Sequence, residues 1–240
     1  MMKYLSIVLV AALFSFTGHK DAKGVLKDMH TRYAGNWYKS FTFTQTTEHY
    51  RNDSLVKTST WYEAIIFPDR FRIDFDDPKA GNAVLYLGDS MYMFRKGKMT
   101  NKRFNDDNLT FLLGGMYFYS LEESAAKLKH MKYDLDKFHE TTWKGKPVYV
   151  IGASNSEEKT NQLWIDKEKL VIVKFIKFKG TLKEEGIFYE HKPFGKAWSE
   201  TAVDFYMNDK LVQREKYHDY KADVRINEAI FDPVNFITIE

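Results

Sequence analysis

The sequence predicts a mainly β protein in which one large, curved antiparallel sheet is accompanied by a few short helices. Three observations support this prediction. Aromatic residues make up 16% of the 240 residues, and aromatic side chains are favoured in strands. Apolar and polar residues alternate in many short segments that end in turn signals. No long helices separate these segments, so neighbouring strands are expected to be antiparallel.

The segment 60–75 is expected to form the central hairpin of the sheet. Its second arm has apolar Phe71, Ile73 and Phe75, which alternate with Arg72 and Asp74. This period of two is typical of a strand with one dry and one wet face. The first arm is apolar nearly throughout, as in the middle of a large sheet.

The turn of this hairpin is predicted at residues 68–70, because proline presets φ and aspartate can bond its own backbone. Phe67 is then expected to pair with Phe71. In that register Ile65 lies opposite Ile73. A two-residue loop would shift the register, and both alternatives remain open.

The remaining elements follow from the same signals. Val25, Leu26, Met29 and Tyr33 share one face of a helix predicted over residues 21–33. An apolar helix is predicted over 109–113, and a second helix follows the capping box of Ser120. Further strands are predicted over 41–47, 56–60, 83–87, 91–95, 141–143, 148–152, 161–165, 170–178, 186–191, 198–207 and 211–221. We expect these segments to form about ten or eleven strands, enough to curl into an open or closed barrel.

The N-terminus has the features of a secretory signal. Lys3 precedes an apolar run of about ten residues, and small residues follow up to Gly18. The alternative is a membrane anchor, but the run is shorter than the roughly 20 residues that a spanning helix needs. We expect residues 1–17 to be a signal peptide, with Ser15 and Thr17 or Gly18 as the cleavage candidates, and residues 18–240 to form one domain.

Composition excludes several classes of protein. The sequence has no cysteine, so the exported chain is expected neither to be acylated as a lipoprotein nor to contain a disulfide. The net charge of +3 is spread without a basic stripe, so nucleic acid is not an expected partner. No nucleophile elbow, P-loop or dinucleotide fingerprint occurs, so we predict neither an enzyme nor a cofactor.

Metal binding finds little support. The seven histidines lack the spacing of metal ligands. Asp74, Asp76 and Asp77 form a carboxylate cluster that could bind calcium or act as an acid and base. They lack the spacing of an EF-hand, and a solvated strand end explains them equally well, so no metal site is predicted.

The order of elements resembles the periplasmic lipoprotein carriers of the LolA type. The matching pieces are residues 43–45 after a short helix, the strand–Pro–strand segment 67–73, the hairpin 85–94, the helix that ends at Gly114, the hairpin at 164–166 and the closing 231–233. The resemblance implies a half-open β-barrel covered by short helices. It also implies a soluble, monomeric periplasmic carrier that shields the acyl chains of lipoproteins, or another lipid, on the way to the outer membrane. Transient contacts with inner- and outer-membrane transport proteins would accompany this role.

The apolar helix at 109–113 can either fill the core or lie as a lid over a lipid cavity. The expected lining residues of such a cavity are Phe43, Ile65, Phe67, Phe71, Ile73, Phe75, Tyr92, Phe94, Leu112, Leu113 and Tyr117. The resemblance has one departure, because the enteric carriers have an arginine latch where this chain has Phe67. The alternative function is a periplasmic sensor of the same fold that binds a membrane-anchored regulatory partner through an edge strand or the outer sheet face.

Overall fold

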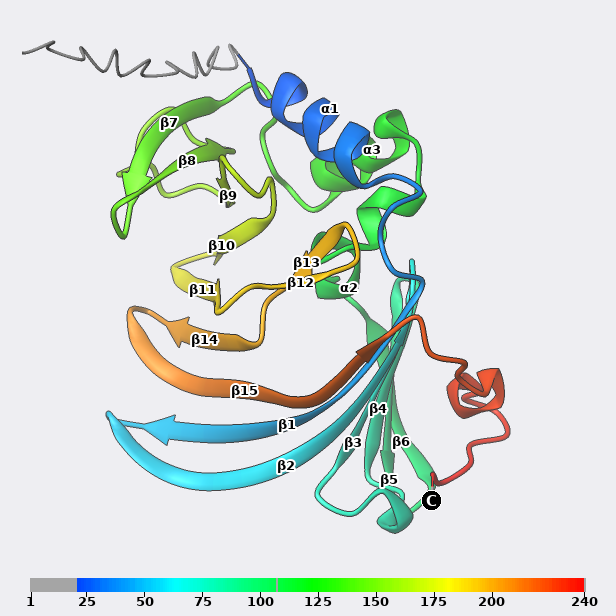
Figure 1. The fold of residues 1–240 in the computed structure, drawn as a ribbon. Helices are drawn as coiled ribbons and strands as arrows, with labels where there is room; N and C mark the ends of the chain where they lie inside the picture. Colours follow the sequence, from blue (N-terminus) through cyan, green and yellow to red (C-terminus); the bar gives the residue numbers. More distant parts are fainter. Residues whose placement is uncertain (1–20, 107, 240) are drawn as a thin grey trace, which may run out of the picture.

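The computed structural model describes residues 21–106 and 108–239, so the predicted signal peptide at 1–17 lies outside the described residues. Within them, thirteen strands form one antiparallel sheet that curves strongly without closing into a barrel (Figure 1). The predicted fold class is therefore confirmed. None of the helices in these ranges is long and apolar enough to cross a membrane.

The sheet runs from β6 at one edge to β7 at the other. In spatial order its strands are β6 (Lys98–Phe104), β5 (Ser90–Arg95), β4 (Ala83–Leu87), β3 (Arg70–Phe75), β2 (Ser54–Ile66), β1 (Ser40–Arg51), β15 (Lys210–Ala222), β14 (Ala202–Met207), β11 (Leu182–Tyr189), β10 (Ile172–Lys179), β9 (Gln162–Asp166), β8 (Lys146–Ile151) and β7 (Phe138–Trp143). A separate small hairpin consists of β12 (Lys192–Phe194) and β13 (Ala197–Ser199).

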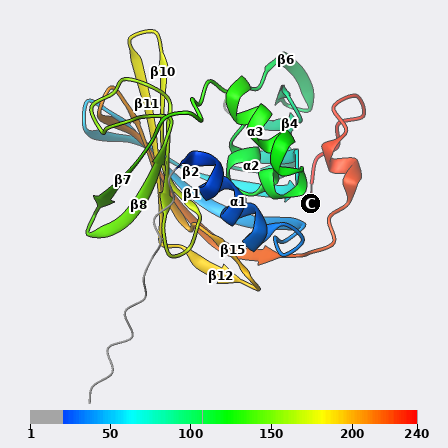
Figure 2. The same cartoon turned by 90° about the horizontal axis from the view of Figure 1, so that it is seen from above.

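The helices lie inside the curve of the sheet (Figure 2). They are α1 (Ala22–Tyr33), α2 (Leu109–Leu112), η2 (Gly115–Phe118) and α3 (Leu121–His130). The predicted face of α1 is buried in the main core, which also contains residues from the other three helices. The predicted capping box is present, because the Ser120 side chain accepts from the Glu123 amide and the Glu123 carboxylate accepts from the Ser120 amide.

The C-terminal segment lies outside the curve, next to β4, β5 and β6 (Figure 1). It contains η3 (Glu228–Phe231), and a further short helix, η1 (Pro78–Ala80), follows β3. Phe236 of this segment stacks on Phe94 with ring centroids 4.1 Å apart. The segment also covers Arg72 and Asp74, which are fully buried. The prediction of a wet outer face on β3 is therefore wrong, because a distant part of the chain packs against that face.

Several strands differ from the sequence prediction. The predicted strand at 56–60 and the first arm of the central hairpin are one continuous strand, β2. β6 was not predicted, because its exposed residues show no apolar alternation and its order comes from backbone pairing with β5. The predicted strand 198–207 is divided between β13 and β14. The described residues contain fifteen strands, more than the ten or eleven expected.

The register of the β2–β3 hairpin also differs. Ile66 pairs with Arg70 and Ile65 with Phe71, so Phe67 does not pair with Phe71. The Phe67 amide instead donates to the Lys39 carbonyl at 3.0 Å, which takes this residue out of the hairpin. Each β2 residue is therefore opposite a β3 residue two positions earlier than predicted, as Ile65 is opposite Phe71 and not Ile73. A shift of two positions leaves every side chain on its predicted face.

Candidate functional site

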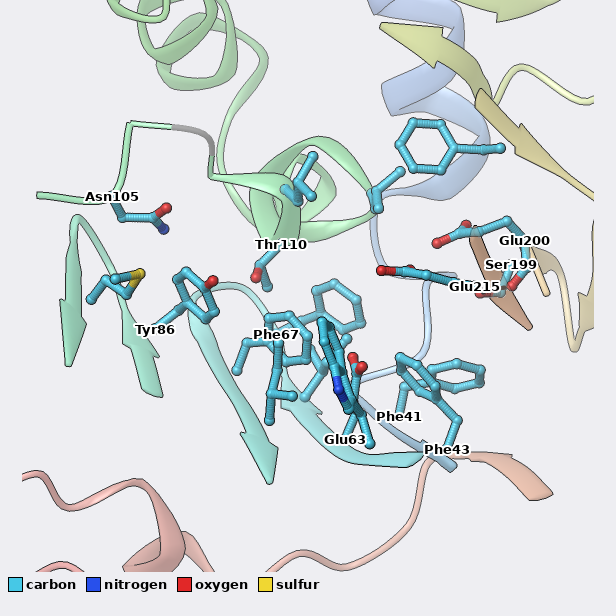
Figure 3. A pocket seen from close by; sticks show the side chains of 18 of the residues that line it. Phe41, Phe43, Glu63, Phe67, Tyr86, Asn105, Thr110, Ser199, Glu200 and Glu215 are labelled. Atoms are coloured by element: carbon cyan, nitrogen blue, oxygen red, sulfur yellow. Dashed lines mark hydrogen bonds between the residues drawn. The ribbon is translucent and has the colours of Figure 1, made fainter. Parts of the chain in front are cut away.

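A cavity of about 270 Å³ lies on the concave side of the sheet, beneath α2 (Figure 3). Its volume is close to the lower end of the range for small-molecule sites, about 300–1,000 Å³. Aromatic and aliphatic side chains provide most of its wall. The apolar lining residues are Tyr38, Phe41, Phe43, Trp61, Ile65, Phe67, Phe71, Ile73, Tyr86, Met91, Phe104, Leu109, Leu113, Phe188, Phe205 and Tyr217.

The alternation of the central strands produces this wall. Ile65 of β2 lies opposite Phe71 of β3, and Phe71 in turn lies opposite Tyr86 of β4. Residues opposite each other on neighbouring strands project to the same face of the sheet. Tyr86 and its partner Met91 on β5 continue the row toward the sheet edge. The cavity wall is thus a continuous row of apolar side chains that crosses β2, β3, β4 and β5.

The α2 helix covers this row of side chains. The Asn108 side chain caps the helix by accepting from the Phe111 amide at 3.2 Å. Leu109, Thr110 and Leu113 line the cavity, which is consistent with their shared helical face. The sequence left open whether this helix fills the core or covers a cavity. Its residues do both, because Phe111 and Leu112 belong to the core cluster.

Two glycines allow α2 and η2 to lie against the β2–β3 turn. A Cβ atom on Gly114 would be 2.2 Å from Nε1 of Trp37, and one on Gly115 would be 2.4 Å from the Pro68 carbonyl oxygen. Contacts this short do not occur in folded proteins without displacement. The close approach of the helical segment to Trp37 and to the β2–β3 turn therefore requires glycine at both positions.

Phe67 connects the sheet to this cover. Its ring stacks on Phe118 of η2 with centroids 5.7 Å apart, and it meets Tyr38 edge-on at 5.5 Å. Only 7% of its surface is exposed. The residue before Pro68 thus makes an aromatic contact between the β2–β3 turn and η2. Burial of such a ring contributes about 1.5–3 kcal/mol.

Of the predicted lining residues, Phe43, Ile65, Phe67, Phe71, Ile73 and Leu113 line the cavity. Leu112 is buried in the main core and does not line the cavity. Tyr117 packs on Trp37 and Tyr33, with centroids 4.8 and 5.0 Å apart. The sequence does not separate these two residues from the cavity lining, because the helical segment is apolar on more than one side.

The other three predicted residues also lie away from the cavity. Tyr92 and Phe94 project to the outer face of the sheet, where they belong to the cluster around Phe236. The sequence could not reveal this, since β5 is apolar on both faces and either set could have faced inward. Phe75 contacts the Trp61 ring, 5.0 Å between centroids, but does not itself line the cavity.

Three buried glutamates also line the cavity. Glu63, Glu200 and Glu215 are 6%, 8% and 6% exposed (Figure 3). Burial raises the pKa of Glu200 to about 8 and that of Glu215 to about 7. The pKa of Glu63 is raised well above its ordinary value, first by burial and then by the nearby Glu215. An apolar cavity thus has an acidic region in its wall.

The sequence analysis missed these acids because they come from separate parts of the chain. Glu63 is the one acid in a strand rich in aromatic residues, and this position was the only sequence feature that could have indicated a buried acid. β1 pairs with both β2 and β15, which brings Glu215 near Glu63. Glu200 directly follows β13, which belongs to a hairpin that was not predicted.

The aspartate cluster noted in the sequence has other uses. Asp74 pairs with Arg72. Asp76 accepts from the Thr60 amide at 3.2 Å, and Asp77 caps η1. In ranges 21–106 and 108–239, no group of three or more histidines and acids is arranged to hold a metal ion.

Solved structures with this architecture come from several bacteria. A DUF1329 family protein from Desulfovibrio piger matches with 13% identity and a TM-score of 0.60, over 88% of this chain and 95% of that one. A domain described as outer membrane lipoprotein-sorting, from Vibrio parahaemolyticus, matches with 16% identity and a TM-score of 0.60, over 88% and 95%. A LolA superfamily protein from Nitrosomonas europaea matches with 12% identity and a TM-score of 0.57, over 89% and 98%.

No family model matches the sequence, and no curated protein matches it. The structural matches nevertheless cover most of the chain, and they show that it has a LolA-like fold. The resemblance inferred from short sequence pieces is thereby confirmed at the level of the fold.

Proposed function

We propose that this protein is a periplasmic carrier that holds the acyl chains of lipoproteins, or of another lipid, in the cavity beneath α2 and delivers them toward the outer membrane. The observation that carries the proposal is a largely aromatic cavity beneath a helical cover, in a fold shared with a domain described as lipoprotein-sorting. Protein interiors are normally close-packed, so a cavity of this size and composition favours an apolar occupant.

The cover also supports this proposal. Phe67, Leu109 and Leu113 meet the cavity through apolar contacts, which depend little on geometry. An acyl chain can replace such contacts with equivalent ones. A carrier needs this property because it must both load and release its cargo.

Native mass spectrometry of the protein isolated from the periplasm tests the proposal. A bound lipid or lipopeptide is expected, and it should be released in organic solvent. Ile65→Phe would occupy part of the cavity and should lower the bound fraction. Leu55→Phe is the matched control, because Leu55 lies 52% exposed at the start of β2. Protein that never contains lipid, from periplasm or after incubation with lipoprotein, would contradict the proposal.

The second candidate is the sensor that binds a membrane-anchored regulatory partner. It is favoured by β6, an edge strand in which every residue is exposed, including Met99 at 45% and Phe104 at 52%. A partner strand could add to this edge through backbone hydrogen bonds. Pull-down from envelope extracts separates the two functions. A stable membrane-protein partner that is lost on β6 substitution would favour the sensor, and transient lipoprotein capture would favour the carrier.

A further inference from the structure

The acidic region of the cavity lacks a counter-charge. No residue in the described part of the chain forms an ion pair with Glu63, Glu200 or Glu215. Arg103 and Lys179 also line the cavity, but neither is among the charges that shift the pKa of these acids. Burial of acids without a cation is unfavourable for folding, so their presence calls for another explanation.

Glu63 is the most isolated of the three acids. Glu215 accepts a hydrogen bond from the Gln213 amide at 2.5 Å and a long one from the Tyr217 hydroxyl at 3.4 Å. By contrast, no side chain or amide of the described ranges donates to the Glu63 carboxyl group. It is nonetheless 94% buried and lies in the cavity wall among aromatic rings (Figure 3). The Glu63 oxygens are not among the enclosed, unpaired polar atoms of the described residues, so they are open to the cavity, where a ligand or water can donate to them.

We propose that the cavity binds an amphiphile that carries an amine, with its acyl chain among the aromatic rings and its nitrogen against Glu63, Glu200 and Glu215. This inference rests on the proposed carrier function and specifies the class of cargo. A neutral carboxylic acid can transfer its proton to a neutral amine, which gives a carboxylate and an ammonium without changing the total charge in the cavity. An ammonium group has three donors and can contact more than one of the acids.

The position of the acids suits such a ligand. Glu63 belongs to the same strand as Ile65 and is opposite Phe43 of β1, so the acidic and aromatic parts of the wall are contiguous. Glu200 and Glu215 lie together on one side of the pocket, away from Asn105 (Figure 3). A ligand with an apolar chain and a single amine would contact both regions at once.

The test compares three probes that share one alkyl chain: dodecylamine, dodecanol and dodecanoate. Each is added below its micelle concentration at neutral pH, and each displaces an environment-sensitive apolar fluorophore from the protein. Dodecylamine is expected to bind about tenfold more tightly than dodecanol, as a charge-assisted hydrogen bond in a buried site would provide. Dodecanoate is expected to bind more weakly than dodecanol.

Glu63→Gln keeps the shape of the side chain and should remove the preference for the amine while dodecanol binding is retained. Glu122→Gln, on the exposed surface of α3, is the matched control and should behave as the unchanged protein. If Glu63→Gln does not fold, as judged by near-UV circular dichroism, Glu200→Gln and the probe series on the unchanged protein decide the question.

The outcomes separate the two proposals. Equal binding of amine and alcohol, unaffected by either substitution, overturns the amine inference but leaves the carrier function in place. Failure of all three probes and of lipoprotein to bind overturns the carrier function and the inference with it. A preference for the amine that survives both substitutions also overturns the inference, because the nitrogen would then lie elsewhere.

Discussion

Arg72 and Asp74 form a two-point ion pair in which Nε and Nη2 of the arginine each lie 2.7 Å from a carboxylate oxygen. Their side chains are 0% and 1% exposed. The remaining Arg72 nitrogen donates to the carbonyls of Ile230 and Ile237 at 2.7 and 2.9 Å, and the Phe236 ring lies over the guanidinium. One side chain therefore fixes the C-terminal segment to the outer face of the central hairpin.

Arg72→Leu is expected to destabilise the protein by about 3–5 kcal/mol, because it leaves a buried carboxylate without a partner. Urea unfolding measures the loss, and limited proteolysis should cleave the released C-terminal segment. Lys57→Leu is the control, since its ion pair with Asp76 is 3.5 Å long and exposed, and its removal should cost less than about 1 kcal/mol. Equal effects of the two substitutions would show that the Arg72 network does not hold the segment.

The three cavity acids predict how stability depends on pH. Their pKa values are raised in the folded protein, to about 8 for Glu200 and about 7 for Glu215, from the ordinary 4.5. The folded state then binds more protons than the unfolded chain, so stability is lost as pH rises through this window. His191 acts in the opposite direction at lower pH, because burial lowers its pKa to about 4 from 6.5. Stability should therefore decline above pH 6.5.

Thermal unfolding between pH 6.5 and 8 measures this decline. Each group contributes a slope of at most about 1.4 kcal/mol per pH unit. Glu200→Gln should flatten the decline and raise the Tm at pH 8, whereas Glu122→Gln should leave the profile unchanged. A Tm that rises over this interval in the unchanged protein would contradict the assignment of raised pKa values.

The sequence predicts features that depend on neighbouring residues, but it does not predict contacts between distant parts of the chain. The alternation of Phe71 and Ile73 predicted that both side chains face the same side of the sheet, which is the cavity side. The expected pairing of β2 with β3 was wrong by two residues, but a shift of two leaves each side chain on its face. The fate of Arg72 could not be predicted from its own strand. It depends on carbonyl groups 158 and 165 residues away, whose position no local pattern encodes.

The same limit applies to the site. Leu113 could be assigned from a short apolar helix between polar segments, yet its neighbours Leu112 and Tyr117 proved to be core residues. Glu200 and Glu215 meet Glu63 only after the sheet is assembled. Sequence patterns identified apolar residues that line the cavity. The three glutamates in its wall could not be identified in this way, because long-range strand pairing brings them together.

Gly115→Ala is expected to displace the helical cover. The added methyl group would lie 2.4 Å from the Pro68 carbonyl oxygen, which is backbone and cannot rotate away. The substitution should therefore weaken retention of a bound fluorophore and lower the Tm. Gly35→Ala is the control, because Gly35 has open space around it and its positive φ of 72° adds only strain of about 1–2 kcal/mol. Loss of fluorophore in both variants alike would assign the effect to stability and not to the cover.

The last prediction concerns the contact between Phe67 and Phe118. Phe67→Glu replaces a ring that stacks on η2 with a carboxylate beside an apolar cavity. Water must then enter between sheet and helix, or the helix must move, because burial of an unpaired charge is strongly unfavourable. We expect the bound-lipid stoichiometry to fall several-fold while far-UV circular dichroism shows an intact sheet. Tyr62→Glu is the matched control, since Tyr62 lies on β2, the strand that directly precedes Phe67, is 36% exposed and does not line the cavity. Unchanged lipid content in folded Phe67→Glu protein would show that this ring takes no part in closing the cavity.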